Sequence, residues 1–294
     1  MYSLNYNTKI IIWKEIFKIF YTRKAFFMKF FKDSQRIVVK FGTSTLTHST
    51  GHLNLRRIEA LVKVLSDIKN SGKQVVIVSS GAVSAGVAKV GFGNIPRTPE
   101  EKQAMAAIGQ SELMKIYDKF FSTYGHTVAQ ILMTKDGLTN PVRRAAAENT
   151  FNRLIEMNCI PIVNENDSIS TDELTKFGGN DILSAYVAKV CHADLLLNLS
   201  DIDGLFDSDP RKNPDARLIG RVDVIDETIY SIAGGAGTDR GTGGMVAKLK
   251  AAELATEDGI PMFILNGHDP EILYTLLDGG HVGTYFAAKE KSND

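Results

Sequence analysis

Ile37-Val38-Val39-Lys40-Phe41-Gly42 and Val75-Val76-Ile77-Val78-Ser79-Ser80-Gly81 are two β-branched runs, and each ends in small residues. Between them an apolar pattern recurs at helical spacing from Leu55 to Ile68, and Gly72 ends it. The stretch therefore predicts a strand, a helix and a second strand. Two strands joined by a crossover helix lie parallel in one sheet, so this stretch predicts an α/β fold.

The remainder of the chain repeats this alternation. We expect further strands at 127–132, 160–163, 194–199 and 261–265, and further helices at 83–90, 100–121, 143–157, 181–191, 245–257 and 271–277. The alternation predicts a three-layer sandwich, in which helices cover both faces of a mainly parallel central sheet. Ligands of such sheets bind beyond the carboxyl ends of the strands, so polar segments that follow strands carry the most information.

The composition of the 294 residues is that of a globular protein, with 44% hydrophobic residues, 23% charged residues and a formal net charge of zero. A balanced charge argues against nucleic acid or a membrane as a partner. Cys159 and Cys191 lack a paired spacing, and we expect buried thiols in a reducing, cytoplasmic compartment. No linker divides the chain, so one domain is predicted at 34–288, with a tail at 289–294.

Residues 1–33 are predicted to be a poorly ordered or amphipathic extension. Seven basic residues stand against the single acid Glu15 within residues 1–32. Four interpretations stay open: sequence upstream of a working start at Met28, a loosely ordered amphipathic extension, a mitochondrial presequence, or an anchor at a membrane surface. None of the four carries chemistry.

Gly241-Thr242-Gly243-Gly244-Met245-Val246-Ala247-Lys248 is the strongest functional signal in the chain. Small, flexible residues lead into a predicted helix, so backbone N–H groups, the helix dipole and the Lys248 ammonium can all act on one anion. The stretch predicts a phosphate site. It matches neither the Walker A loop nor the dinucleotide-binding fingerprint.

Polar segments follow three of the predicted strands. Lys40–Ser44 fits an anion site in which a glycine lets N–H groups approach closely, or a turn with a snorkelling lysine. Ser79–Ala82 fits a nest for an anion or polar substrate, or an N-cap serine. Asn164–Ser168 fits a site where Asp167 receives an ammonium and Asn166 bonds a carboxylate or amide, or a turn with Asx caps.

Two later segments extend the pattern. Asp181 opens a predicted helix, where it caps the helix, holds a lysine or orients a hydrated Mg²⁺. Ser200–Phe206 follows an apolar strand and suits the base and ribose of a nucleotide. The histidines are scattered singly, so they predict no metal site, and no Ser/His/Asp order stands out.

The order of these segments is more specific than any one of them. In that order the sequence resembles the amino acid kinase superfamily over about Arg36–Phe286, and within it the members that phosphorylate L-glutamate. The strings Ile162–Asp167 and Gly241–Lys248 carry most of the resemblance. Acetylglutamate, carbamate, aspartate and uridylate kinases share the implied fold but resemble these two strings less well.

The resemblance implies ATP-dependent phosphorylation of the L-glutamate side-chain carboxylate to γ-glutamyl 5-phosphate, the first step of proline biosynthesis, with ATP and Mg²⁺. It implies three catalytic residues, in which Lys40 and Lys248 act on the transferring phosphoryl group and Asp181 holds the lysines or orients Mg²⁺. The implied ATP-binding residues are Lys40, Gly42, Thr43, Ser44, Ser200, Asp201, Thr242, Gly243, Gly244, Met245, Val246, Ala247 and Lys248. The implied substrate-binding residues are Ser80, Gly81, Asp167 and Asn180, with Gly81 also a donor of N–H; no side chain is assigned to a metal.

The resemblance also has departures and alternatives. Gly179 stands where the family usually has an acidic residue, and the C-terminal RNA-modification-type domain of many bacterial relatives is not expected. The family implies a homodimer or homotetramer and inhibition by proline, without nucleic acid or membrane partners.

Two other functions stay open: a kinase for another acceptor, such as N-acetylglutamate or carbamate, and a non-catalytic sensor of a nucleotide or amino acid. A nucleic-acid binder has only the basic N-terminal segment in its favour.

Overall fold

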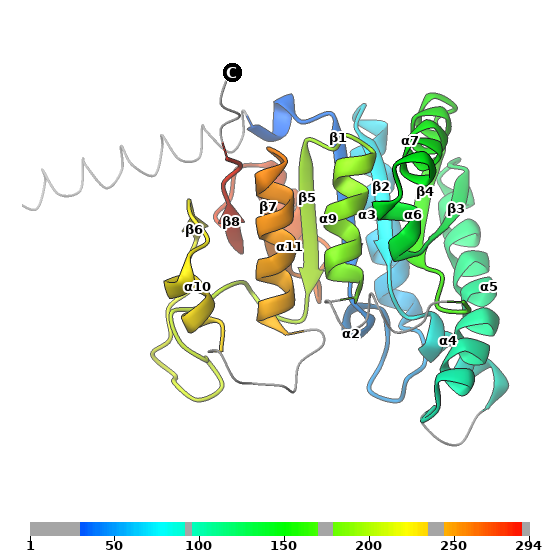
Figure 1. The fold of residues 1–294 in the computed structure, drawn as a ribbon, viewed down its shortest axis with the longest axis horizontal. Coiled ribbons are helices and arrows are strands. Elements are labelled where there is room, and N and C mark those ends of the chain that lie inside the picture. Colours follow the sequence, from blue (N-terminus) through cyan, green and yellow to red (C-terminus); the bar gives the residue numbers. More distant parts are fainter. Residues whose placement is uncertain (1–29, 92–95, 170–178, 235–243, 290–294) are drawn as a thin grey trace, which may run out of the picture.

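A mainly parallel sheet of eight strands runs through residues 30–91, 96–169, 179–234 and 244–289, the part of the chain that the computed structural model describes (Figure 1). Across the sheet the order is β3 (Val128–Met133), β4 (Ile160–Glu165), β2 (Gln74–Ser79), β1 (Arg36–Phe41), β5 (Leu195–Ser200), β7 (Met262–Asn266), β8 (Thr284–Phe286) and β6 (Arg221–Val222). The pair β7 and β8 is antiparallel, and the other paired strands are parallel. The predicted fold class is confirmed.

Helices form a layer on each face of this sheet. In chain order they are α2 (Thr43–Leu46), α3 (Leu55–Asn70), α4 (Ala82–Val90), α5 (Pro99–Thr123), α6 (Lys135–Thr139), α7 (Pro141–Glu156), α9 (Gly179–Val190), α10 (Glu227–Ile232), α11 (Met245–Glu257) and α12 (Ile272–Leu277). Figure 1 shows α9 and α11 crossing the near face of the sheet. Helices α3, α5 and α12 pack on the opposite face, in a separate hydrophobic core from α7, α9 and α11.

The central strands send alternate side chains into these two cores. On β1, Ile37 and Val39 pack with α3, α5 and α12, whereas Val38 packs with α7, α9 and α11. On β2 the same alternation places Ile77 in the first core and Val76 in the second. Burial on both faces explains why these strands read as continuous β-branched runs in the sequence.

Side-chain caps fix where the helices begin. Helix α5 starts at Pro99 because Thr98 and Glu101 form a reciprocal capping box. Helix α7 starts at Pro141, two residues before the predicted start, because the Asn140 side chain accepts from the N–H groups of Val142 and Arg143. Sequence periodicity does not register such caps, since it follows only apolar spacing.

Strand β4 runs two residues further than the sequence predicts. Asn164 and Glu165 continue the pairing with Leu132 and Met133 of β3, and both are buried. The predicted end of this strand at residue 163 is therefore wrong, because backbone pairing persists after the apolar side chains end. The short elements α2, α6, α10, β6 and β8 were not predicted, since two to six residues give no readable period.

The N-terminal residues that the structure describes contribute to the core. Residues 30–33 are helical, and the Phe31 ring is buried 5.6 Å from the Phe263 ring. Residues 1–29, including Met28, lie outside the described part. The predicted domain boundary at 34 stays a prediction, although apolar packing reaches back to Phe31.

The two cysteines differ in their surroundings. Cys191 is buried, and burial raises the pKa of its thiol to about 12. Cys159 is partly exposed, so the prediction that it is buried is wrong. It lies between α7 and β4, where the chain turns at the surface. Among the described helices, none combines the length and the apolar character needed to cross a bilayer.

Candidate active site

The carboxyl ends of β1, β2, β4 and β5 meet the first turn of α9, and most of the predicted site residues gather there. Two consecutive residues of α9 divide the site into two halves. Asp181 bonds to two lysines, whereas Asn180 bonds to serine and asparagine groups. We call Lys40, Asp181 and Lys248 the lysine cluster, and Gln110, Asn164 and Asn180 the amide chain.

The lysine cluster joins three segments that are far apart in the sequence. Lys40 Nζ lies 2.6 Å from Asp181 Oδ1, and Lys248 Nζ lies 3.2 Å from Asp181 Oδ2. Asn198 Nδ2 donates a further hydrogen bond of 2.8 Å to Asp181 Oδ1. The carboxylate therefore holds both ammonium groups, so the structure brings together the three residues predicted to be catalytic.

The charged side chains of this cluster are buried, which strengthens the electrostatic interactions among them. The exposed fraction is 4% for Lys40, 3% for Asp181 and 5% for Lys248. Burial alone would raise the pKa of Asp181, but the two ammonium groups and the Asn198 bond lower it below its usual value. Burial, together with repulsion by Lys248, lowers the pKa of Lys40, although Asp181 acts against this. The three residues of the cluster carry two positive charges and one negative charge, and Asp201 acts on Lys40 from outside the cluster. A ligand anion would compensate the positive charge of the cluster.

The amide chain forms the neutral half of the site. Gln110 Oε1 accepts a bond of 2.9 Å from Asn164 Nδ2, and Asn164 Oδ1 accepts one of 2.9 Å from Asn180 Nδ2. Asn180 Nδ2 also lies 2.9 Å from the Ser79 carbonyl and 2.9 Å from Ser80 Oγ. Helices α5 and α9 and strands β2 and β4 are thereby tied together at the site.

Asn180 Oδ1 is buried, and no hydrogen-bond partner for it is found among the described residues. Buried polar atoms are normally paired, since an unpaired one costs about 1–3 kcal/mol. Rotating the amide by half a turn would not help, because its nitrogen faces two carbonyl-type oxygens that cannot donate. The oxygen is therefore a ready acceptor for a ligand donor such as an ammonium.

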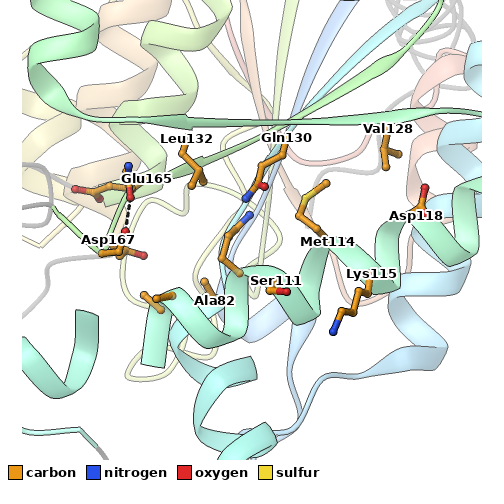
Figure 2. A pocket seen from close by; sticks show the side chains of 15 residues that line it. Ala82, Ser111, Met114, Lys115, Asp118, Val128, Gln130, Leu132, Glu165 and Asp167 are labelled. Carbon is orange, nitrogen blue, oxygen red and sulfur yellow. Dashed lines mark hydrogen bonds between the residues drawn. The ribbon is translucent and has the colours of Figure 1, made fainter. Parts of the chain in front are cut away.

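Asp167 lies at one end of an open groove of about 570 Å³ between β3 and α5, which we call the α5 groove (Figure 2). Side chains of Gln130 and Leu132 on β3 face those of Met114 on α5 across it. Burial, with repulsion by Glu165, raises the pKa of Asp167 to about 6. The groove borders the Asp167 end of the site, and neither lysine of the cluster lines it.

The residues predicted on the nucleotide side lie around the lysine cluster. A Cβ added to Gly42 would lie 3.7 Å from Lys40 Nζ, so the Gly42 backbone borders the ammonium. The Gly42 N–H points to the Leu199 carbonyl at 3.4 Å, whereas Thr43 and Ser44 are exposed at the start of α2. This pairing leaves Gly42 a weaker donor for phosphate than the sequence predicts, because its N–H already has a carbonyl partner.

The other predicted nucleotide residues follow β5 or open α11. Ser200 ends β5 and is buried, and its hydroxyl donates to Asp201 at 3.0 Å. Asp201 is close enough to Lys40 to act on it electrostatically. The segment that opens α11 contains Gly244, Met245, Val246 and Ala247, ahead of Lys248. Thr242 and Gly243, with Gly241, lie outside the described residues.

The unusual Gly179 has a local structural reason. Its φ is +55°, a left-handed conformation that residues other than glycine rarely adopt, although no neighbour in the described part of the chain would block a Cβ. An acidic residue at this position would meet a strained backbone. The structure thus accounts for glycine in this chain at the point where α9 begins.

Sequence reasoning missed three residues of the site. Asn198 was treated as part of an apolar strand, yet its side chain bonds Asp181. Asn164 belongs to a segment for which a site and an Asx-capped turn both stay open, and Gln110 lies in a predicted helix without a predicted role, yet the two bond to each other in the amide chain. A polar residue at an inward position of a buried strand is the signal that could have revealed Asn198 and Asn164. Gln110 carries no such signal, because α5 is amphipathic.

The arrangement suits transfer of an anionic group between two anionic partners. Its buried surplus of positive charge can stabilise charge that develops on phosphoryl oxygens. In the other half, the Asp167 carboxylate, with its raised pKa, and Asn180 Oδ1, which has no partner among the described residues, can accept hydrogen bonds from an ammonium. Among the described residues, no three or more His, Cys, Asp and Glu side chains gather as a metal cluster.

Comparison with known proteins agrees with this geometry. The profile of the amino acid kinase family matches residues 35–266, and the chain belongs to this family. It is a phosphotransferase. One curated relative, glutamate 5-kinase of Clostridium perfringens, is 54% identical over 265 residues, which cover 89% of this chain and 98% of the relative. Glutamate 5-kinase of Listeria innocua is 48% identical over 263 residues, covering 88% and 95%.

Solved structures share the fold at much lower identity. UMP kinase from Bacillus anthracis superposes with a TM-score of 0.61 at 18% identity, over 87% of this chain and 97% of that chain. Isopentenyl phosphate kinase from T. acidophilum superposes with a TM-score of 0.56 at 18% identity, over 86% and 100%. These likenesses confirm the predicted sandwich, and at this identity they carry no information on the acceptor.

Proposed function

We propose that the chain transfers the γ-phosphoryl group of ATP to the side-chain carboxylate of L-glutamate, giving ADP and γ-glutamyl 5-phosphate. A carboxylate oxygen forms a bond to the γ-phosphorus while the bond to the β–γ bridging oxygen breaks. The acceptor is already ionised near neutral pH, so no proton has to be removed. Glutamate 5-kinase relatives at 46–54% identity over most of the chain support this reaction.

One observation carries the proposal. Two buried lysines from opposite ends of the domain converge on one aspartate, beside a half-site that can receive an ammonium. Repulsion between an anionic acceptor and a triphosphate is the main barrier to this transfer. A pre-formed, desolvated surplus of positive charge reduces that repulsion, and its effect is greater than in water.

We assign Lys40 and Lys248 to the transferring phosphoryl group and the phosphates beside it. Asp181 keeps both ammonium groups aimed at that group, because each of its oxygens binds one lysine. Asp181 touches no substrate in this assignment, so it acts through the lysines. Asn198 supports it by holding the oxygen that Lys40 also contacts.

The assignment of the nucleotide side follows the same geometry. Thr43 and Ser44 provide exposed donors for phosphate, and Gly42 lets the chain pass close to Lys40. Ser200 and Asp201 border the base and ribose. The remaining proposed contacts are Thr242, Gly243, Gly244, Met245, Val246 and Ala247.

We assign L-glutamate to the half formed by Ser80, Gly81, Asp167 and Asn180. The α-ammonium of the substrate is a donor for the Asp167 carboxylate and for the unpaired Asn180 Oδ1. An acylated amine, as in N-acetylglutamate, would bring no charge to Asp167. This argument favours a free amino acid as acceptor over the two other acceptors considered from the sequence.

Mg²⁺ is a further part of the proposal. It usually binds one or two carboxylates and the phosphates of the substrate, and keeps several waters. The acids beside the phosphate position are Asp181, which the lysines occupy, and the exposed Asp201, so the residues fit a cation held mainly by the nucleotide. When bound, Mg²⁺ would neutralise phosphate charge.

The direct test is to incubate the purified chain with ATP, Mg²⁺, L-glutamate and hydroxylamine, and to measure the γ-hydroxamate. N-acetylglutamate, aspartate and carbamate serve as rival acceptors in a parallel assay of ADP release. We expect hydroxamate and ADP with L-glutamate and little ADP with the rivals. ADP release with N-acetylglutamate or carbamate at comparable kcat/KM would contradict the choice of acceptor. Ligand-induced thermal shifts without any ADP would indicate a sensor.

Four finer points belong to the same proposal. Proline inhibits by competing at the glutamate half, the chain forms a homodimer or homotetramer, it works in the cytoplasm, and its kinase domain spans 34–288. Inhibition kinetics at varied glutamate test the first point, light scattering coupled to gel filtration the second, and imaging of a tagged chain the third. The activity of a chain trimmed to residues 34–288 tests the fourth.

A further inference from the structure

We propose that Gln110, on α5, is a positioning residue for the amino-acid substrate, because it holds Asn164, whose Oδ1 is one of the acceptors that orient the Asn180 amide. The inference rests on the proposed function, in which Asn180 contacts L-glutamate. Gln110 itself touches no reacting atom in this proposal. Its effect on the reaction passes along the amide chain.

The argument starts from the near symmetry of a side-chain amide. Its oxygen and its NH₂ group have almost the same size, so a half-turn exchanges an acceptor for two donors at little steric cost. For Asn180 such a turn would present NH₂ instead of Oδ1 to the unpaired position. A substrate ammonium would then meet a donor instead of an acceptor. Binding of the substrate therefore depends on one of two orientations.

Hydrogen bonds select that orientation step by step. The backbone N–H of Glu165 can only donate, and it lies 2.9 Å from Asn164 Oδ1. This bond, with the 2.9 Å bond from Asn164 Nδ2 to Gln110 Oε1, orients the Asn164 amide. Asn164 Oδ1 and the Ser79 carbonyl each accept from Asn180 Nδ2 at 2.9 Å, and together they leave Asn180 Oδ1 for the substrate.

Helix α5 holds Gln110 in place through unusually close packing. A Cβ on the neighbouring Gly109 would lie 1.8 Å from the carbonyl oxygen of Ala82, and one on Gly86 would lie 1.9 Å from that of Met105. Only glycine lets the backbones of α4 and α5 approach this closely. Further along α5, Tyr117 and Ser79 share a buried hydrogen bond of 2.9 Å. The helix is thus fixed on both sides of Gln110.

The surroundings of Gln110 favour a positioning role over a purely structural one. The residue is 7% exposed, and no partner for its Nε2 is found in the described part of the chain. An unpaired buried NH₂ lowers stability, and an apolar side chain of similar shape would avoid that cost. What the amide provides here is a directed acceptor for Asn164, and this acceptor is what the proposal uses.

The test compares Gln110→Met with Gln130→Met. Methionine has a similar length and lacks the acceptor, while Gln130 lies on the same α5 groove without belonging to the amide chain (Figure 2). For Gln110→Met we expect the KM for L-glutamate to rise about 2- to 10-fold, the effect of one hydrogen bond, with the KM for ATP unchanged. For Gln130→Met we expect both values unchanged. Gln110→Leu removes the same bond with a different shape and replaces Gln110→Met if that variant does not fold.

A double-mutant cycle separates this proposal from the proposed function. In an Asn180→Ala background, Gln110→Met should add no further rise in the KM for L-glutamate, because the group it orients is gone. An unchanged KM for L-glutamate in Asn180→Ala would overturn the assignment of Asn180. If Asn180→Ala raises this KM and Gln110→Met does not, only the role of Gln110 is wrong. A lower melting temperature and kcat, with no selective change in this KM, would show that Gln110 is purely structural.

Discussion

The lysine cluster and the amide chain begin at consecutive residues of α9, and both are largely buried, but they use opposite means. The cluster gathers charge, with two ammonium groups on one carboxylate. The amide chain is neutral and consists of directed hydrogen bonds. Charge suits the half where the charge of the reactants changes, whereas neutral groups can orient a substrate without repelling its carboxylates. Removing a member of each half should therefore have different consequences.

The largest effect is expected from Asp181→Ala. This change leaves two buried ammonium groups without their anion, which should cost about 3–5 kcal/mol of unfolding free energy. Because the pKa of Asp181 is lowered in the folded state, the stability it contributes is present above its ordinary pKa and is lost as pH falls below it. Urea denaturation at several pH values measures both effects. Asp223→Ala, at an exposed ion pair with Arg221, serves as control and should cost less than about 1 kcal/mol.

A nearly equal effect, on turnover instead of stability, is expected from Lys248→Ala. Loss of one pre-organised charge typically lowers kcat about 100- to 1000-fold. Initial rates of hydroxamate formation measure it. Lys250 lies two residues further along α11 and is exposed, so Lys250→Ala is the matched control and should leave kcat unchanged. Near-normal turnover of Lys248→Ala would remove this lysine from the reaction.

The substrate half, in which Asp167 stands beside the neutral amide chain, should respond through binding, and Asp167 gives it a pH dependence. Only the ionised carboxylate attracts the substrate ammonium, and its pKa is raised to about 6. We therefore expect kcat/KM for L-glutamate to fall as pH drops below about 6. Asp167→Asn should lower kcat/KM about 10- to 100-fold at neutral pH, as expected for a hydrogen bond to a charged group, and should abolish this inflection. An inflection that persists in the variant would belong to another group.

The smallest effect is expected from Tyr117→Phe, which removes the buried hydroxyl that bonds Ser79 behind the amide chain. One neutral hydrogen bond contributes about 0.5–1.5 kcal/mol to stability. Urea denaturation should show a loss of this size that does not depend on salt, and the kinetic constants should change less than in Gln110→Met, because the close packing of α4 on α5 still holds the helix. A large, salt-dependent loss would mean that charge, not the neutral bond, dominates here as well.

The two halves also differ in how far the sequence reveals them. The alternation of strands and helices predicts the sandwich, because the spacing of apolar residues indicates which side of each element is buried. Lys40, Asp181 and Lys248 were found because charged residues at strand ends and helix starts stand out from their neighbours. Gln110 and Asn164 were missed as site residues, because an amide on a helix or strand looks ordinary until its partner from another element is known. Close contacts such as Gly109 against Ala82 depend on how two helices cross, which no local pattern records.

The long separation of the two lysines affects the protein while it is being made. Lys40 and Asp181 are 141 residues apart, and Lys248 follows Asp181 by another 67. A nascent chain on the ribosome therefore contains Lys40 without Asp181 for almost half of its synthesis, and the pair without Lys248 until its last quarter is translated. The complete lysine cluster can therefore form only after most of the chain has been made.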